Sequence, residues 1–172
     1  MNFDLNKTTD LLERTPKILE DLLSGLSEDW ILNNEGDNTW SPYDIVGHLI
    51  HGERTDWMAR LEIILHKDDK KFIPYDRFAQ YKESEGKSLQ QLLSEFALLR
   101  KENLQKLKSL NLTENDLNKT SIHPEFGEVT LSQLLSTWTI HDLTHIAQIT
   151  RVMAKQYKDA IGPWIKYFRL MQ

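Results

Sequence analysis

His141 and His145 are the residues whose spacing most clearly indicates chemistry. Residues four apart on a helix lie on one face with Cβ atoms roughly 5–6 Å apart, so both imidazoles can reach one ion. Burying two imidazoles costs free energy unless each is hydrogen-bonded or binds a metal. Two interpretations stay open, a pair of hydrogen-bonded core histidines or two ligands of a metal site. Both histidines fall in a seam that also contains Leu131, Leu134, Trp138, Gln148 and Val152.

A third histidine can be placed on the same side of the protein from helical periodicity. With about 100° per residue, His48 shares a stripe with Ile45, Gly52 and Ala59, and Gly52 leaves room beside it. His51 falls on the flank of that helix, so we expect it to be solvated or peripheral. Three histidines without a thiolate are typical of a metal site that keeps a position open for water, as in catalytic centres.

Four other polar residues are weaker candidates. Asp56 lies two turns from His48, where it can orient a ligand, act as an acid–base group or pair with an arginine. Gln148 can hydrogen-bond a water on the ion or only fill the seam. We expect His123 to be solvated or locally hydrogen-bonded in a loop, and His66 to favour the C-terminal end of a helix dipole. The sequence identifies no general base, so the catalytic residues are left unassigned.

Composition excludes several classes of protein. The chain has 172 residues, which at about 150 residues per domain predicts one domain over 1–172. With 21 basic and 26 acidic residues the formal charge is −5, which makes nucleic acid an unfavourable partner. Cysteine is absent, which excludes disulfides and thiolate ligands. The N-terminal decapeptide is unlike a signal peptide and no apolar window is long enough for a membrane span, so we expect a cytoplasmic protein.

The elements that must position these residues are predominantly helical. We predict an all-α fold, a four-helix bundle with a long crossover connection and a short C-terminal helix. No strand-rich region is expected. Pro16 is expected to kink or divide the first helix. The predicted helices cover Leu5 to Leu26, Ser41 to about His66, Ser88 to about Leu110, Thr130 to about Val152 and about Ala160 to Leu170, with irregular connections over 67–87 and 111–130.

The second helix has a further apolar face that needs a partner. One helix in a bundle seldom needs two wide apolar faces. We therefore predict that this face packs either the C-terminal helix or a two-fold related copy, which makes a homodimer one expected assembly. The face consists of Val46, Ile50, Trp57, Leu61 and Ile64.

Several motifs together resemble those of one family, the DinB/YfiT-like superfamily. The run Trp40-Ser41-Pro42 followed by Gly47-His48-Leu49 resembles the start of that family's second helix. The segments 123–131 (HPEFGEVTL) and 141–148 (HDLTHIAQ) look like its last bundle helix and the lead-in to it. The resemblance covers the chain from Leu5 to about Val152, and the combination of motifs is specific.

This resemblance implies a metal site and a range of activities. Carried over by position, it implies one divalent metal ion per chain, usually zinc or nickel, held by His48, His141 and His145. Members of the family include thiol-dependent S-transferases that use bacillithiol or mycothiol, a maleylpyruvate isomerase and proteins named as metal-dependent hydrolases, and members commonly dimerise. We expect a low-molecular-weight-thiol S-transferase acting on a small molecule. The alternatives are a metal-dependent hydrolase and a non-catalytic metal- or ligand-binding bundle.

Overall fold

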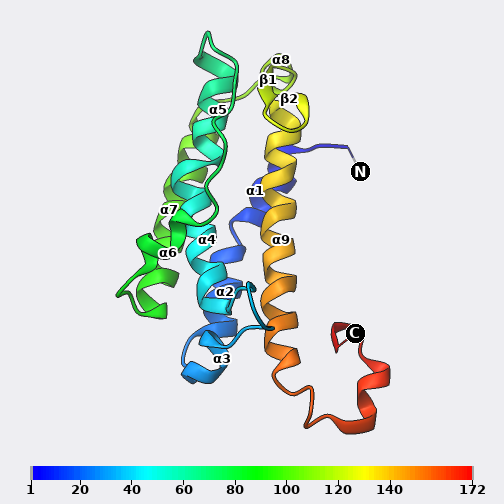
Figure 1. Ribbon diagram of the computed structural model, residues 1–172. Coiled ribbons are helices and arrows are strands. Elements are labelled where there is room, and N and C mark those ends of the chain that lie inside the picture. The colour runs from blue at the N-terminus through cyan, green and yellow to red at the C-terminus, as the bar shows by residue number, and fades with distance from the viewer. Residues whose placement is uncertain (1, 172) are drawn as a thin grey trace.

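The computed structural model describes residues 2–171 and shows the predicted four-helix bundle (Figure 1). The first long helix is divided into two parts and precedes a short helix, α3 (Glu28–Leu32). A break after Leu12 separates these two parts, and Pro16 lies in the first turn of the second part, as predicted. The four bundle helices are α1 (Leu5–Leu12) with α2 (Thr15–Leu23), α4 (Pro42–Thr55) with α5 (Trp57–His66), α7 (Leu89–Ser109) and α9 (Leu131–Lys155).

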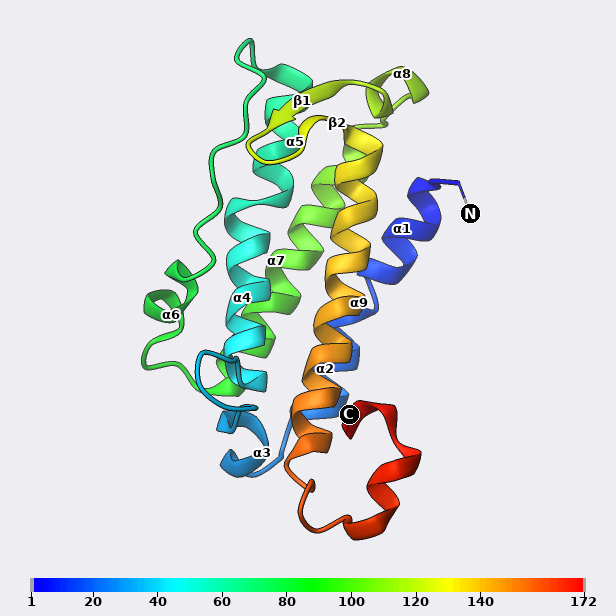
Figure 2. The same ribbon diagram turned by 45° about the vertical axis from the view of Figure 1, so that its right-hand side comes forward.

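A long connection allows the second and third bundle helices to run in the same direction. Residues 67–78 return along the outside of α4 and α5, and the short α6 (Ala79–Ser84) follows before α7 begins (Figures 1 and 2). The predicted crossover is therefore present. Because of it, α4 and α7 run in parallel, whereas α9 runs in the opposite direction beside α4.

Three of the long helices begin after Ser41, Ser88 and Thr130, as the sequence predicts. Each has a capping box, in which the side chain of the N-cap residue accepts a hydrogen bond from the backbone amide three residues later, at position N3. The side chain of the N3 residue in turn accepts a hydrogen bond from the backbone amide of the N-cap residue. These reciprocal bonds satisfy amides that otherwise have no partner in the first turn of a helix. The capping pairs are Ser41 with Asp44 for α4, Ser88 with Gln91 for α7, and Thr130 with Gln133 for α9.

The second helix is not continuous to His66 as predicted, because it is interrupted at Asp56. This residue has φ −109° and ψ −71°, outside regular helical geometry. The Trp57 indole lies over Gly52, where a Cβ atom would be 3.2 Å from its Nε1. Helical arithmetic from Ile45 consequently fails beyond the interruption, and Ala59, predicted to share the inward stripe, is exposed.

The bundle itself covers the second apolar face of α4 and α5. Val46 and Ile50 belong to a buried cluster with α7, and Trp57 belongs to a second cluster where its ring stacks on Trp138 of α9 with centroids 5.6 Å apart. Leu61 and Ile64 complete the same covered face. The prediction that the C-terminal helix or another copy covers this face is wrong, because α7 and α9 already do so.

A buried ionic network connects the bundle helices. The Arg100 guanidinium of α7 donates to Asp142 of α9 at 2.6 Å, to Glu53 of α4 at 2.8 Å and to the carbonyl of Leu12 at 2.8 Å. Glu53 also accepts from the Trp138 indole at 3.0 Å. Paired charges satisfied in this way avoid the large cost of an isolated buried ion. The network holds α4 and α9 in a fixed relation.

Two features at the ends of the bundle differ from the helical prediction. A hairpin, β1 (Thr120–His123) and β2 (Gly127–Thr130), follows the single turn α8 (Glu114–Leu117) within the segment expected to be irregular. Such short strands show too little alternation for a sequence pattern to reveal. The predicted C-terminal helix is instead two 3₁₀ turns, η1 (Gly162–Tyr167) and η2 (Arg169–Met171). Across residues 2–171, every helix is too short or too polar to cross a membrane.

Candidate metal centre

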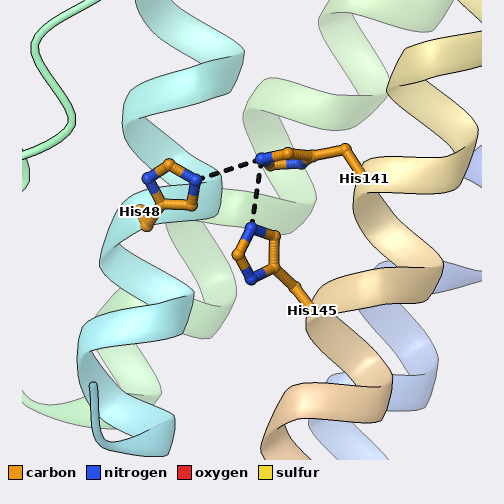
Figure 3. A group of neighbouring side chains, drawn as sticks. All are labelled: His48, His141 and His145. Atoms are coloured by element: carbon orange, nitrogen blue, oxygen red, sulfur yellow. Dashed lines mark hydrogen bonds between the residues drawn. The ribbon is translucent and has the colours of Figure 1, made fainter. Parts of the chain in front are cut away.

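Three imidazoles from two helices converge between α4 and α9 (Figure 3). His48 reaches across from α4, while His141 and His145 lie one turn apart on α9. His141 Nε2 is 3.0 Å from His48 Nε2 and 3.1 Å from His145 Nε2. One ring nitrogen from each residue lies within 4.8 Å of the others. The structure therefore brings together the three histidines that the sequence selected.

Side chains contact the far side of two of the rings, and for His145 this contact determines which nitrogen carries the proton. Gln148 Oε1 is 2.8 Å from His145 Nδ1 and is an acceptor, so Nδ1 donates the proton and Nε2 keeps its lone pair. Tyr75 Oη lies 3.4 Å from His48 Nδ1, and this hydroxyl can either accept from that nitrogen or donate to it. Gln148 therefore orients His145 through a hydrogen bond, a role different from the two expected, which were filling the seam and hydrogen-bonding a water on the ion.

With this tautomer of His145, the three Nε2 atoms cannot all satisfy one another. If His141 Nε2 carries a proton it can donate to only one of its two neighbours, and if it does not, the lone pair of His145 has no donor. His141 Nδ1 is buried without a hydrogen-bond partner among the described residues. A cation at the centre accepts all three lone pairs, so the donor set fits a divalent ion with nitrogen ligands.

Burial keeps these rings in the neutral form that metal binding requires. Desolvation, together with a smaller effect of the neighbouring imidazoles, lowers the pKa of His48 to about 3 and that of His141 to about 2. Desolvation also lowers the pKa of His145, although its bond to Gln148 acts in the opposite direction. Neutral imidazoles are therefore available at pH 7.

A tryptophan before α4 covers one side of the cluster. The Trp40 ring lies 4.6 Å from the His48 ring and 6.2 Å from the His145 ring, measured between centroids. The loop that carries Trp40 is attached to α9 through Glu35, whose carboxylate accepts from Arg151 at 2.7 Å. The pKa of Glu35 is lowered to about 2, chiefly by this bond.

The cluster opens into a cavity of about 990 Å³. The walls are largely aromatic and apolar, and they include Trp57, Phe72 and the hairpin residue Phe126. Asp56 also lines the cavity, where it pairs with Arg60 at 2.6 Å. Burial raises the pKa of Asp56, although Arg60 partly offsets the effect. Of the roles considered for Asp56, the structure shows the ion pair with an arginine. Asp56 nevertheless lines the cavity that contains the histidines.

The remaining histidines lie outside the cluster. His51 is only 5% exposed and its Nδ1 lies 2.9 Å from Glu83 Oε1, so the expectation of a solvated residue is wrong. Its position off the inward stripe is confirmed. His123 Nδ1 accepts from the amide of Glu125 at 3.1 Å, the local bond expected of it, although the ring also lines the cavity. His66 is exposed at the end of α5.

Sequence reasoning missed several residues around the cluster. Tyr75 lies in the irregular connection, and no spacing relates it to His48. Glu35 reaches its α9 partner across 116 positions of sequence. Phe126 lies in the segment 123–131 that resembles the family, but no spacing relates it to the three histidines. The i, i+3 relation of His145 and Gln148 was the one local signal, and the structure gives that pair a hydrogen bond.

Comparisons with known proteins agree with this architecture. One solved structure, described as "YfiT from Bacillus subtilis is a probable metal-dependent hydrolase with an unusual four-helix bundle topology", matches with a TM-score of 0.76 and 22% sequence identity over 88% of this chain and 87% of that chain. No curated protein sequence gives a significant match. The family model of the DinB superfamily matches residues 11–149, which is most of the chain. The protein therefore belongs to the DinB superfamily.

Proposed function

We propose that this protein is a metal-dependent hydrolase whose ion is held by His48, His141 and His145. The observation that carries the proposal is the convergence of three Nε2 atoms, 3.0 and 3.1 Å apart along the cluster, beside a large cavity. A site of three neutral ligands leaves coordination positions open on the cavity side. Zinc and nickel, the ions implied by the family resemblance, are the first to test.

The residues around the site have distinct roles in this proposal. When bound, a divalent ion here supplies Lewis-acid chemistry, polarising a substrate oxygen and lowering the pKa of a water. Gln148 and Tyr75 orient two of the imidazoles, and Trp40 shields the cluster from solvent. Asp56 is the candidate acid–base group, because its carboxyl faces the cavity and burial raises its pKa. Arg60 keeps that carboxyl in place.

We propose hydrolysis in preference to the thiol transfer that was expected from the sequence. The structural neighbour is described as a probable metal-dependent hydrolase, and nothing among the comparisons supports a thiol as co-substrate. The cavity suits a small-molecule substrate, since its volume lies within the usual range for such sites, about 300–1,000 Å³.

One set of measurements tests the proposal. The protein is purified without a histidine tag, analysed for metals, loaded with zinc or nickel, and assayed on carboxylic esters and amides with and without chelator. We expect about one ion per chain and chelator-sensitive hydrolysis. A matched assay supplies bacillithiol or mycothiol with model electrophiles. Conjugation without hydrolysis would replace the proposal by a thiol transferase, and a bound ion with neither activity would favour a non-catalytic binding protein.

A further inference from the structure

An exposed aromatic ring stands at the rim of the histidine cavity. Phe126, at the tip of the β1–β2 hairpin, is 74% exposed and nevertheless lines the cavity. One face of its ring stacks on His123, with centroids 4.5 Å apart and planes at 17°. Because one face is covered and most of the residue is exposed, the ring has free apolar surface beside the cavity.

The hairpin that carries this ring is fixed to the long connection. The amide of Phe72 donates to the carbonyl of Ile122 at 3.0 Å, and the amide of Ile122 donates to the carbonyl of Lys70 at 2.7 Å. The ring of Phe72 meets the edge of His123 at 6.1 Å. Phe126 and His123 therefore rest on a platform made by two chain segments, which limits the entropy lost when a ligand stacks there.

The charges in the cavity wall do not select an anionic substrate. Two arginines line it, Arg60 and Arg77, against three acidic residues, Asp56, Asp76 and Glu125. Arg60 is paired with Asp56, and the guanidinium of Arg77 lies over the ring of Phe78 at 5.1 Å. Most of the remaining wall is apolar or aromatic. This lining suits an uncharged planar group better than a phosphate or a polyanion.

We propose that the substrates are esters or amides of compounds with a planar aromatic group, and that Phe126 determines this specificity by stacking on that group. This inference rests on the proposed hydrolase function. In this proposal the carbonyl group of the substrate lies toward the histidines, and its aromatic group lies against the hairpin. In the reaction the acyl C–O or C–N bond breaks, the acyl carbon gains the hydroxyl of water, and the leaving oxygen or nitrogen gains its proton.

Binding of two hydroxamates to the zinc-loaded protein tests this proposal without relying on turnover. Benzohydroxamate and acetohydroxamate share a metal-binding group and differ in the aromatic ring. By calorimetry, we expect benzohydroxamate to bind at least threefold more tightly. Phe126→Ala and Phe126→Leu should reduce that preference by roughly three- to tenfold, which is the usual contribution of one stacked aromatic pair to affinity. Both variants should leave acetohydroxamate binding nearly unchanged. Phe168→Ala, at an exposed aromatic residue outside the cavity lining, is the matched control and should change neither affinity.

A second measurement separates failure of the specificity from failure of the metal site. The neutral fluorophore N-phenyl-1-naphthylamine is titrated into chelator-treated protein, and Phe126→Ala should weaken its binding at least threefold. Equal binding of the two hydroxamates, or equal loss of both in Phe126→Ala, would overturn the aromatic specificity and leave the hydrolase proposal intact. Absence of any hydroxamate binding would reject the proposed function, and an unchanged fluorophore titration would reject the role of Phe126 independently of the metal.

Discussion

Two buried histidines provide a matched test of which imidazoles hold the ion. His145 is 8% exposed and His51 is 5% exposed, and the Nδ1 atom of each ring is hydrogen-bonded to a neighbouring side chain. Only His145 directs Nε2 at the other two rings of the cluster. Removing either side chain disturbs the core, so the loss of stability alone cannot distinguish them. The difference in melting temperature with and without chelator can.

The expected magnitude follows from ligand linkage and chain length. An ion present at a hundredfold excess over its dissociation constant stabilises the native state by about 2.7 kcal/mol. For a chain of 172 residues, each kcal/mol shifts the melting temperature by about 2–4 °C, so chelation should lower that of the wild type by about 5–11 °C.

The assay is a melting scan of metal-loaded protein with and without chelator, paired with metal analysis. His48→Ala, His141→Ala and His145→Ala should each lose the ion and the chelator-dependent shift. His51→Ala should melt at lower temperature in both conditions, because it loses its bond to Glu83, but should keep the ion and the full shift. His123→Ala should do the same with little loss of stability. A full chelator shift in His145→Ala, or its absence in His51→Ala, would refute the assignment of the ligands.

Three further predictions concern protons, orientation and the buried network. In the presence of chelator, the fold should lose stability as pH falls from about 6.5 toward about 3, because His48 and His141 take up protons when unfolded but not when buried. Melting temperatures at pH 7 and pH 5 check this, and an equal pH dependence after both residues are changed to Gln would count against it. Gln148→Leu should weaken zinc binding by roughly 10- to 100-fold, measured by competition with a chromophoric chelator, since His145 loses its orienting acceptor; unchanged affinity would contradict that role. Arg100→Met should cost about 3–5 kcal/mol in urea unfolding because two carboxylates stay buried without their cation, whereas exposed Lys101→Met should cost less than about 0.5 kcal/mol; equal losses would refute this account.

Local patterns in the sequence predicted most of the helical framework. The three capping boxes involve residues three apart, so their bonds depend on only one turn of chain. Pro16 marked the division of the first helix for an equally local reason, the missing amide of proline. The short strands depend on a distant segment, because Ile122 pairs with the backbone of Lys70 and Phe72. No local spacing predicted these strands, the 3₁₀ geometry after Gly162 or the interruption at Asp56.

For the candidate site too, local spacing predicted some of the residues and long-range packing decided the others. The sequence by itself determined the His141–His145 pair, because one helical turn brings such residues to a common face, and it indicated His48 through the inward stripe before the interruption. Only the tertiary structure decided that His48 lies 3.0 Å from a histidine 93 positions away, that Tyr75 contacts the ring of His48, and that His51 is hydrogen-bonded to Glu83. These contacts depend on the crossover and on the approach of α4 to α9, which long-range packing determines.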